Sequence, residues 1–321
     1  MSNNSPEETI EEITHSHEVV STEVELTSSR RKVFNKYMVA ISIVALIALF
    51  TYLFLTAEQL TNLQAALHKD NYLFYWMLLV GFFAEIVAGS VGMGYGVICT
   101  TILLILNVPP TVISASIHSA ESFTSAAGSI SHWQLGNMNK KLVKALAIPA
   151  IIGAVLGALA LTYVGEKYAK ATKPFIAVYS MYLGIRILQN AFKKKDDNKK
   201  KKKTNITSLG LIGGFIDSFG GGGWGPLVTG TFIKNGHTPR YVIGSSTFAK
   251  CILTVASAIT FIFTIGIHHW NIVAGLLIGG IITAPFSAML TAKIPVKKMF
   301  VVVGTVVIVM SLITIYRAFF L

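Results

Sequence analysis

Long apolar segments separated by short polar stretches make up the chain from residue 36 onward. Most of them hold about 20 residues or more, the length that a helix needs to cross the ~30 Å hydrocarbon layer of a membrane. The segments are 36–55, 72–107, 111–133, 142–164, 174–192, 209–235, 240–268, 271–292 and 296–321. This pattern predicts an all-α, polytopic membrane protein.

Two of the segments contain a glycine-rich interruption. As a single helix, segment 72–107 would be ~54 Å long, which is too long for one crossing and too short for two crossings with a turn. Its glycines at 89, 92, 94 and 96 lie near the middle. We therefore expect two half-helices in a V that enters and leaves by the same face. Segment 209–235 repeats this design, with glycines at 220–223.

The two halves of the chain also share an aligned pattern, 129 residues apart. Ser-Ala-Glu at 119–121 aligns with Phe-Ala-Lys at 248–250, and Ser-Ala-Ala at 125–127 aligns with Thr-Val-Ala at 254–256. Duplicated apolar segments broken by glycine are typical of secondary transporters built from structural repeats. We expect repeat 1 over 72–192 and repeat 2 over 205–321, with an extra transmembrane helix over 36–57 in front of them.

The V-shaped segments determine how the two repeats are related. Each repeat would hold one V-shaped broken helix and three transmembrane helices, and three crossings turn the second repeat upside down. Such inverted repeats bring the two glycine breaks face to face, where half-helix ends can bind an ion. The expected mechanism is alternating access.

Composition and charge agree with this topology. The chain is 53% hydrophobic and 13% charged, and its charges are concentrated in an acidic tail over 1–35, which we expect to be disordered, and a lysine-rich loop over 193–204. The positive-inside rule makes that loop and the N-terminus cytoplasmic and the C-terminus external, in an inner or plasma membrane. The excess of 27 basic over 15 acidic residues is explained by orientation in the bilayer, and no basic, aromatic-interleaved surface indicates nucleic acid.

Ionisable residues inside apolar segments are costly and mark functional sites. Glu85 and Asp217 precede the two breaks, where each either caps a half-helix or acts on substrate or protons. Glu121 and Lys250 are repeat equivalents that either form a structural ion pair or supply a protonatable group and an anion attractor. His118 lies on the same helical face as Glu121, as a proton shuttle or as a packed side chain.

These observations give two sets of candidate residues. The expected substrate-binding set is Gly92, Gly94, Gly96, Gly221, Gly222, Gly223, Trp224 and Lys250, and the expected coupling or gating set is Glu85, His118, Glu121 and Asp217. The glycine run lacks the Gly-Lys-Ser/Thr ending of a P-loop, no nucleophile elbow occurs, and no zinc spacing is present. We expect neither an enzyme nor a cofactor or metal site. Gly153/Gly157 and Gly275/Gly279 have the spacing of close helix contacts.

The chain resembles the TauE/SafE family of sulfite and organosulfur-anion exporters over residues 72–320. The matching elements are Gly-Phe-Ile-Asp at 214–217, Gly-Gly-Gly-Gly-Trp-Gly-Pro at 220–226, Gly-His-Thr-Pro-Arg at 236–240, Ile-Gly-Ser-Ser at 243–246, His-Ser-Ala-Glu-Ser-Phe-Thr at 118–124, Ser-His-Trp at 131–133 and Leu-Gly-Asn at 135–137. The resemblance implies export of a small sulfur-containing anion, such as sulfite or a sulfonate. Two departures matter: the first break has no consecutive glycines, and Lys250 stands where related sequences tend to carry an acid.

Three kinds of function therefore remain open. The preferred one is a carrier whose partners are a small anionic substrate, the lipid bilayer and a coupling ion, either proton or sodium. An anion channel on the same scaffold is the first alternative. A membrane scaffold or sensor that binds a partner through its tail or its lysine loop is the second.

Overall fold

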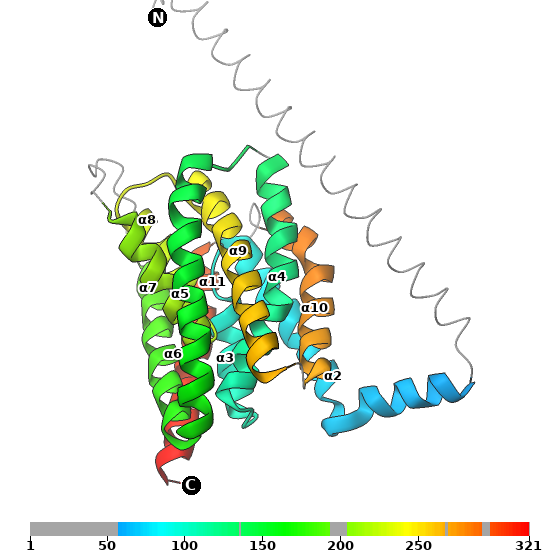
Figure 1. Ribbon diagram of the computed structural model, residues 1–321. Helices are drawn as coiled ribbons and strands as arrows, with labels where there is room; N and C mark the ends of the chain where they lie inside the picture. Colours follow the sequence, from blue (N-terminus) through cyan, green and yellow to red (C-terminus); the bar gives the residue numbers. More distant parts are fainter. Residues whose placement is uncertain (1–56, 135, 193–203, 267–268, 291–295, 321) are drawn as a thin grey trace, which may run out of the picture. The chain divides into compact units, whose positions relative to one another are not determined.

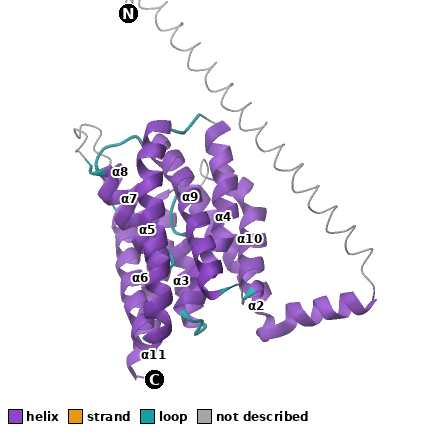
Figure 2. Cartoon of the chain, in the orientation of Figure 1, coloured by secondary structure: helices purple, strands orange, loops and turns teal. Residues whose placement is uncertain are grey.

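The computed structural model describes residues 57–134, 136–192, 204–266, 269–290 and 296–320. Within these ranges the chain is helical and contains no strand (Figures 1 and 2). The helices are α2 (Ala57–Val91), α3 (Tyr95–Ile105), α4 (Pro110–Gln134), α5 (Lys140–Lys167), α6 (Ala169–Ala191), α7 (Ile206–Gly220), the π-helical turn η1 (Gly225–Thr229), α8 (Gly230–Lys234), α9 (Pro239–Ile265), α10 (Trp270–Leu290) and α11 (Val296–Phe320). The predicted tail, the body of the extra N-terminal helix and the lysine loop over 193–203 lie outside the described residues.

Most predicted segments correspond to one helix each, and both interrupted segments are broken where the glycines lie. Two helix starts differ from the prediction by five residues or more. Helix α2 begins at Ala57, well before the apolar segment at 72, and α6 begins at Ala169 instead of 174. At α6 polar residues precede the apolar stretch and belong to the same helix, whereas in α2 the backbone turns at Tyr72, with a φ angle of 63°, where the apolar segment was expected to begin.

Local sequence explains where several helices begin. The Asn139 side chain accepts hydrogen bonds from the backbone N–H groups of Lys141 (3.0 Å) and Leu142 (3.2 Å), which caps α5. Asn205 caps α7 in the same way through the N–H of Ser208, at 3.2 Å. Proline occupies the first position of α4 and of α9, where its missing N–H costs no helical hydrogen bond.

The breaks themselves depend on glycine. Gly92 and Gly94, between α2 and α3, have φ angles of 76° and 115°. Gly221, which ends α7, has a φ angle of 71°. L-residues with a side chain rarely adopt such left-handed conformations, so glycine allows the chain to leave one helix and start the next within a few residues.

Helices α2 to α11 belong to one compact unit. It contains the described residues up to Trp133 and those from Asn137 onward. Within it, α10 packs along α2, α5 along α7, and α11 along α6. A Cβ added at Gly153 or Gly157 would collide with the carbonyl oxygens of Leu211 and Phe215 of α7. A Cβ added at Gly275 or Gly279 of α10 would likewise collide with the carbonyl oxygens of Phe74 and Leu78 of α2. The expected close helix contacts are therefore confirmed.

Contacts between helix ends show that the second broken element turns back on itself. Asn235, just after α8, donates from Nδ2 to Oγ1 of Thr204, just before α7, at 2.8 Å. The first broken element ends next to two other helix termini. Lys173 near the start of α6 donates to Oδ1 of Asn107 at 2.6 Å, and Arg317 near the end of α11 donates to the carbonyl of Ile105 at 3.3 Å. In Figure 1, α8 and the end of α3 lie at opposite ends of the helices.

Four helices among the described residues are long and apolar enough to cross a membrane, judged by length and composition: Tyr72–Gly89, Lys140–Gly165, Pro239–Ile265 and Phe300–Phe320. Helices α3, α7 and part of α10 are apolar but shorter. Helix α4 was predicted to cross and falls short in apolar content, because many of its inward residues are polar: Ser114, Ser116, His118, Glu121, Thr124, Ser125, Ser129 and Ser131 are buried.

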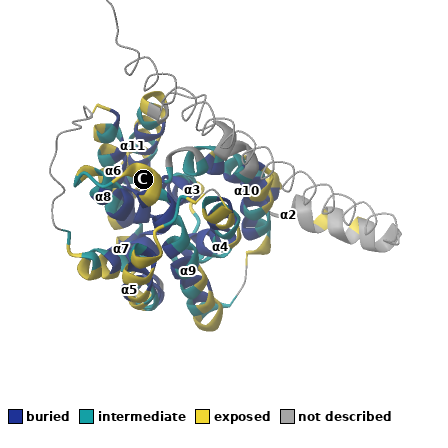
Figure 3. Cartoon of the chain, turned by 90° about the horizontal axis from the view of Figure 1, so that it is seen from above, coloured by how far each residue is buried: buried dark blue, intermediate teal, exposed yellow. Residues whose placement is uncertain are grey.

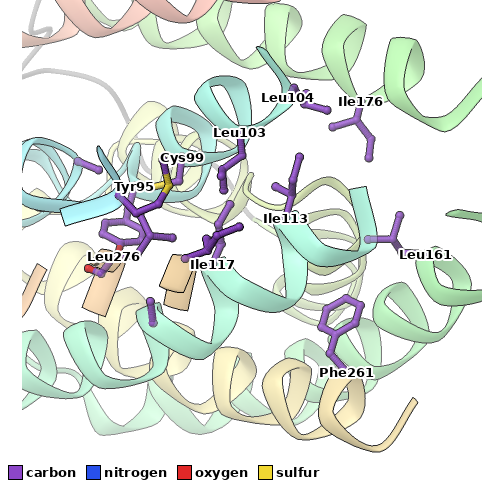
Figure 4. Close-up of a cluster of buried hydrophobic side chains, with 14 of the residues drawn as sticks. Tyr95, Cys99, Leu103, Leu104, Ile113, Ile117, Leu161, Ile176, Phe261 and Leu276 are labelled. Carbon is purple, nitrogen blue, oxygen red and sulfur yellow. Dashed lines mark hydrogen bonds between the residues drawn. The ribbon is translucent and has the colours of Figure 1, made fainter. Parts of the chain in front are cut away.

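Large apolar side chains cover the outer faces of the helices, and the buried positions hold both apolar and polar residues. Figure 3 shows buried residues concentrated where helices face one another and exposed residues on their outer faces. Exposed apolar side chains include Phe83, Ile148, Phe175, Phe263, Val302 and Phe319. One buried apolar cluster includes Tyr95, Cys99 and Leu103 of α3, Ile117 of α4 and Phe261 of α9 (Figure 4). Such an apolar exterior is what a lipid environment requires.

Candidate functional site

The two glycine breaks meet backbone to backbone. A Cβ built on Gly96 would lie 2.6 Å from the carbonyl oxygen of Gly221 and 2.8 Å from the Cα of Gly222. One built on Gly222 would lie 2.6 Å from the carbonyl carbon of Gly96. Real side chains essentially never approach so closely. The expectation that the breaks face one another is therefore confirmed, and this contact admits no side chain at either glycine.

Two side chains that the sequence did not single out hold the second break in place. Thr100 of α3 donates from Oγ1 to the carbonyl of Gly221 at 2.8 Å. Tyr179 of α6 donates from its hydroxyl to the carbonyl of Gly222 at 3.0 Å. Thr100 follows Gly96 by one helical turn, which was a usable signal. Nothing in the sequence around Tyr179 indicated its role.

Asp217 spans the second break. Its Oδ1 accepts a hydrogen bond of 2.7 Å from the backbone N–H of Trp224, the residue before η1. The carboxylate thus caps the second half-helix, as one of the two interpretations of Asp217 expected. Trp224 was a predicted substrate-binding residue, but its indole N–H donates to the carbonyl (3.1 Å) and the hydroxyl (2.8 Å) of Ser246 in α9. In this conformation that side chain anchors the break.

Glu121 and Lys250 form a buried ion pair between α4 and α9. Their side chains are 4% and 14% exposed. Two more contacts lie beside it: Ser125 is 3.5 Å from Thr254, and the Cys251 thiol is 3.9 Å from the carbonyl of Ser122. All three contacts join residues 129 positions apart. In each of them a residue touches its own counterpart in the other half of the chain.

His118 lies on the face of α4 that carries Glu121, as expected, but its partner is a different acid. Its Nε2 lies 3.4 Å from Oδ2 of Asp217 in α7, and both side chains are fully buried. On the other side of the ring, Nδ1 lies 2.7 Å from the carbonyl oxygen of Ser114. The Ser114 hydroxyl donates to the carbonyl of Ser218 at 2.5 Å, so α4 and α7 are joined here by two polar contacts.

Glu85 completes the group. It is buried in α2, 8% exposed, and lies within electrostatic range of Glu121 and Lys250, with Thr124 beside it. Asp217 and Lys250 also interact electrostatically. The four ionisable residues predicted from the apolar segments, together with His118, therefore gather into one buried cluster from α2, α4, α7 and α9. Below we call these five residues the charged cluster.

A small pocket lies near this cluster, at the end where α9 leads into α10. Its volume is about 30 Å³, and Ser116, Ser119, Phe261 and His269 are among its lining residues. Phe261, one of its lining residues, packs against His118, with ring centroids 6.2 Å apart.

A family model described as sulfite exporter TauE/SafE matches residues 77–314, a range that includes both breaks and the whole charged cluster. The chain belongs to this family. The TauE/SafE chain is 37% identical over 242 residues to "Probable membrane transporter protein YtnM" of Bacillus subtilis (strain 168), an alignment that covers 72% of this chain and 79% of that protein.

More distant relatives carry similar names. A "Probable membrane transporter protein" of Haemophilus influenzae (strain ATCC 51907 / DSM 11121 / KW20 / Rd) is 25% identical over 69% of this chain and 90% of its own length. "Probable membrane transporter protein YjnA" of Bacillus subtilis (strain 168) is 22% identical over 74% and 97%. No solved structure matches the chain. Family and relatives establish a multi-pass membrane transport protein.

Proposed function

We propose that this protein is a secondary carrier that exports a small sulfur-containing anion, sulfite or an organosulfonate, by alternating access. One observation carries the proposal: two glycine breaks from opposite halves of a TauE/SafE chain meet beside a buried charged cluster that contains a lysine. Broken helices of this kind form the substrate sites of secondary transporters.

Two inverted repeats supply the moving parts in this proposal. The three contacts between residues 129 apart support it, because residues meet their own counterparts only close to a two-fold axis. Three helix contacts agree with it: α2 packs on α10 as α7 packs on α5, and α6 packs on its counterpart α11. Rocking of one repeat against the other would then open the site to each side in turn.

The anion would bind at the first break. Helix α3 begins after Gly94, whose left-handed backbone directs the chain into the helix, and no side chain caps this start among the described residues. Its first amides can therefore face an anion, with Gly92 and Gly94 allowing close approach, whereas the backbone of the second break already packs against Gly96. At the second break Asp217 already occupies the amide of Trp224, so Gly221, Gly222 and Gly223 contribute shape.

Lys250 supplies positive charge for the anion, and the remaining residues of the charged cluster control when its ammonium is available. In this conformation the Lys250 ammonium is paired with Glu121. An arriving anion would share that ammonium with Glu121, and Glu85, His118 and Asp217 would set the conformation in which the pair is restored. Release of the anion restores the pair and closes the cycle.

Orientation follows the loop charges. The end that bears Lys140, Lys141, Lys144 and Lys234 faces the cytoplasm in this proposal, with the N-terminus inside, the C-terminus outside and an inner or plasma membrane around the helices. Export then means movement from the lysine-bearing end to the end that carries Lys167 and Arg317.

Counterflow in proteoliposomes tests the proposal. Unlabelled sulfite or taurine inside the vesicles should drive uptake of the labelled anion. Lys250→Glu should change the affinity for the anion or its pH dependence while the protein still folds, and Lys144→Glu, the same charge change at an exposed position of α5, should change neither.

Two outcomes would favour the alternatives. Large single-channel currents without counterflow would identify an anion channel. Activity that survives substitution of both breaks and disappears on deletion of the tail or the lysine loop would identify a scaffold or sensor. Unchanged transport by Lys250→Glu would remove Lys250 from the binding site.

A further inference from the structure

The charged cluster contains one permanent cation for three acids. Lys250 Nζ is bonded to Glu121 and also interacts electrostatically with Asp217 and Glu85. These acids come from α4, α7 and α2, so they approach the ammonium of α9 from three helices. His118 of α4 is the other titratable group of the cluster, and it faces Asp217.

The position of the lysine is unusual within the chain's own symmetry. Its counterpart 129 residues earlier is Glu121, the acid to which it is bonded. With an acid or a neutral residue at 250, Glu121 would have no permanent counter-charge at this contact. A buried carboxylate without one must take up a cation or become protonated.

A proton is the cation that Glu121 can take up without further ligands, because one carboxylate is enough to bind it. The ammonium of Lys250 therefore stands where the chain would otherwise need a proton.

We propose that Lys250 is a built-in counter-charge that replaces a coupling proton at Glu121, so that the anion crosses without proton coupling. This inference rests on the carrier proposed above and specifies how it is driven. The anion then moves down its own electrochemical gradient, and the tethered ammonium stays behind to neutralise Glu121 again. Replacing Lys250 by a neutral residue converts the protein into a proton-coupled carrier.

Thermal unfolding of the purified full-length protein tests this without any substrate. Lys250→Ala should become more stable as the pH falls from mildly alkaline to mildly acidic, because a proton then neutralises Glu121. The wild type and Lys250→Arg, which retain the charge, should gain less over the same pH range, since the buried Glu85 contributes to the pH response of all variants. The double variant Glu121→Gln/Lys250→Ala should lose the extra gain, which separates Glu121 from Glu85, Asp217 and His118, all still present.

Measurement of anion efflux provides a second test. A protonophore that collapses the pH gradient should leave wild-type anion efflux unchanged when the membrane potential is clamped, and it should slow efflux by Lys250→Ala several-fold. Slowed wild-type efflux overturns the inference even if Lys250→Ala does not fold. Equal pH responses of wild type and Lys250→Ala also overturn it. Absence of anion transport, with the stability pattern as expected, contradicts the proposed function and leaves the counter-charge at Glu121 established.

Discussion

Gly96→Ala is the sharpest test of the contact between the two breaks. The new methyl group would lie 2.6 Å from the carbonyl oxygen of Gly221 and 2.8 Å from the Cα of Gly222, whereas ordinary van der Waals contact begins at 3.4 Å. Both obstacles are backbone, so no rotamer change can relieve the overlap. Overpacking of this kind costs about 1–3 kcal/mol, and the two breaks must separate to accommodate it.

Gly230→Ala is the matched control. Gly230 lies in α8, just beyond the second break, and a Cβ there would have its nearest neighbours at 3.6 and 3.7 Å. Both glycines are helical, so both substitutions gain the same backbone preference for alanine, about 0.5–1 kcal/mol. The difference between the two variants therefore measures the contact of the breaks.

Thermal unfolding in detergent and counterflow in proteoliposomes provide the two readouts. Gly96→Ala should lower the unfolding midpoint relative to Gly230→Ala and should reduce transport more than its loss of stability explains, since the breaks meet at the proposed substrate site. Gly222→Ala should behave like Gly96→Ala, and the double variant should cost less than both together because the first separation admits the second methyl group. If Gly96→Ala were as stable and active as Gly230→Ala, the reasoning would be refuted.

Three further variants test the charged cluster and the anchor of the second break. Glu121→Gln leaves the Lys250 ammonium without its carboxylate and should destabilise the protein by about 3–5 kcal/mol, most of which Glu121→Gln/Lys250→Met should restore; an unaffected single variant would contradict a buried pair. Trp224→Phe removes the indole donor and should cost about 1–3 kcal/mol, measured by thermal unfolding, because the acceptors remain buried. Asp217→Asn keeps an acceptor for the Trp224 amide but removes the charge beside His118, so transport should fall more than stability; equal losses would show a purely structural carboxylate.

Much of the fold could be predicted because segment length and glycine position are local properties. The breaks at 92–94 and 221–224 follow from glycines within apolar runs, and the capping role of Asp217 follows from its position before the second break. Boundaries were less predictable where polar residues extend a helix, as at the start of α6. The low apolar content of α4 has the opposite cause, since its polar residues face the protein interior.

It was harder to predict which residues contact one another within the site than to predict which residues belong to it. Glu85, His118, Glu121, Asp217 and Lys250 could be found because each is a polar residue in an apolar segment, and the Glu121–Lys250 pair follows from the repeat. That His118 faces Asp217 depends on how α4 is rotated against α7, which sequence spacing does not specify. The tethers from Thr100 and Tyr179 likewise arise from packing between helices distant in the chain.

The contacts between residues 129 apart have an evolutionary consequence. In a symmetric dimer of two identical half-length chains, a residue on the two-fold axis meets a copy of itself, so a glutamate at position 121 would face another glutamate. A lysine opposite that glutamate requires two halves with different sequences, which one chain that contains both repeats can supply. If the two halves are repeats, as proposed above, the Glu121–Lys250 pair is therefore a feature that a homodimer of one half could not possess.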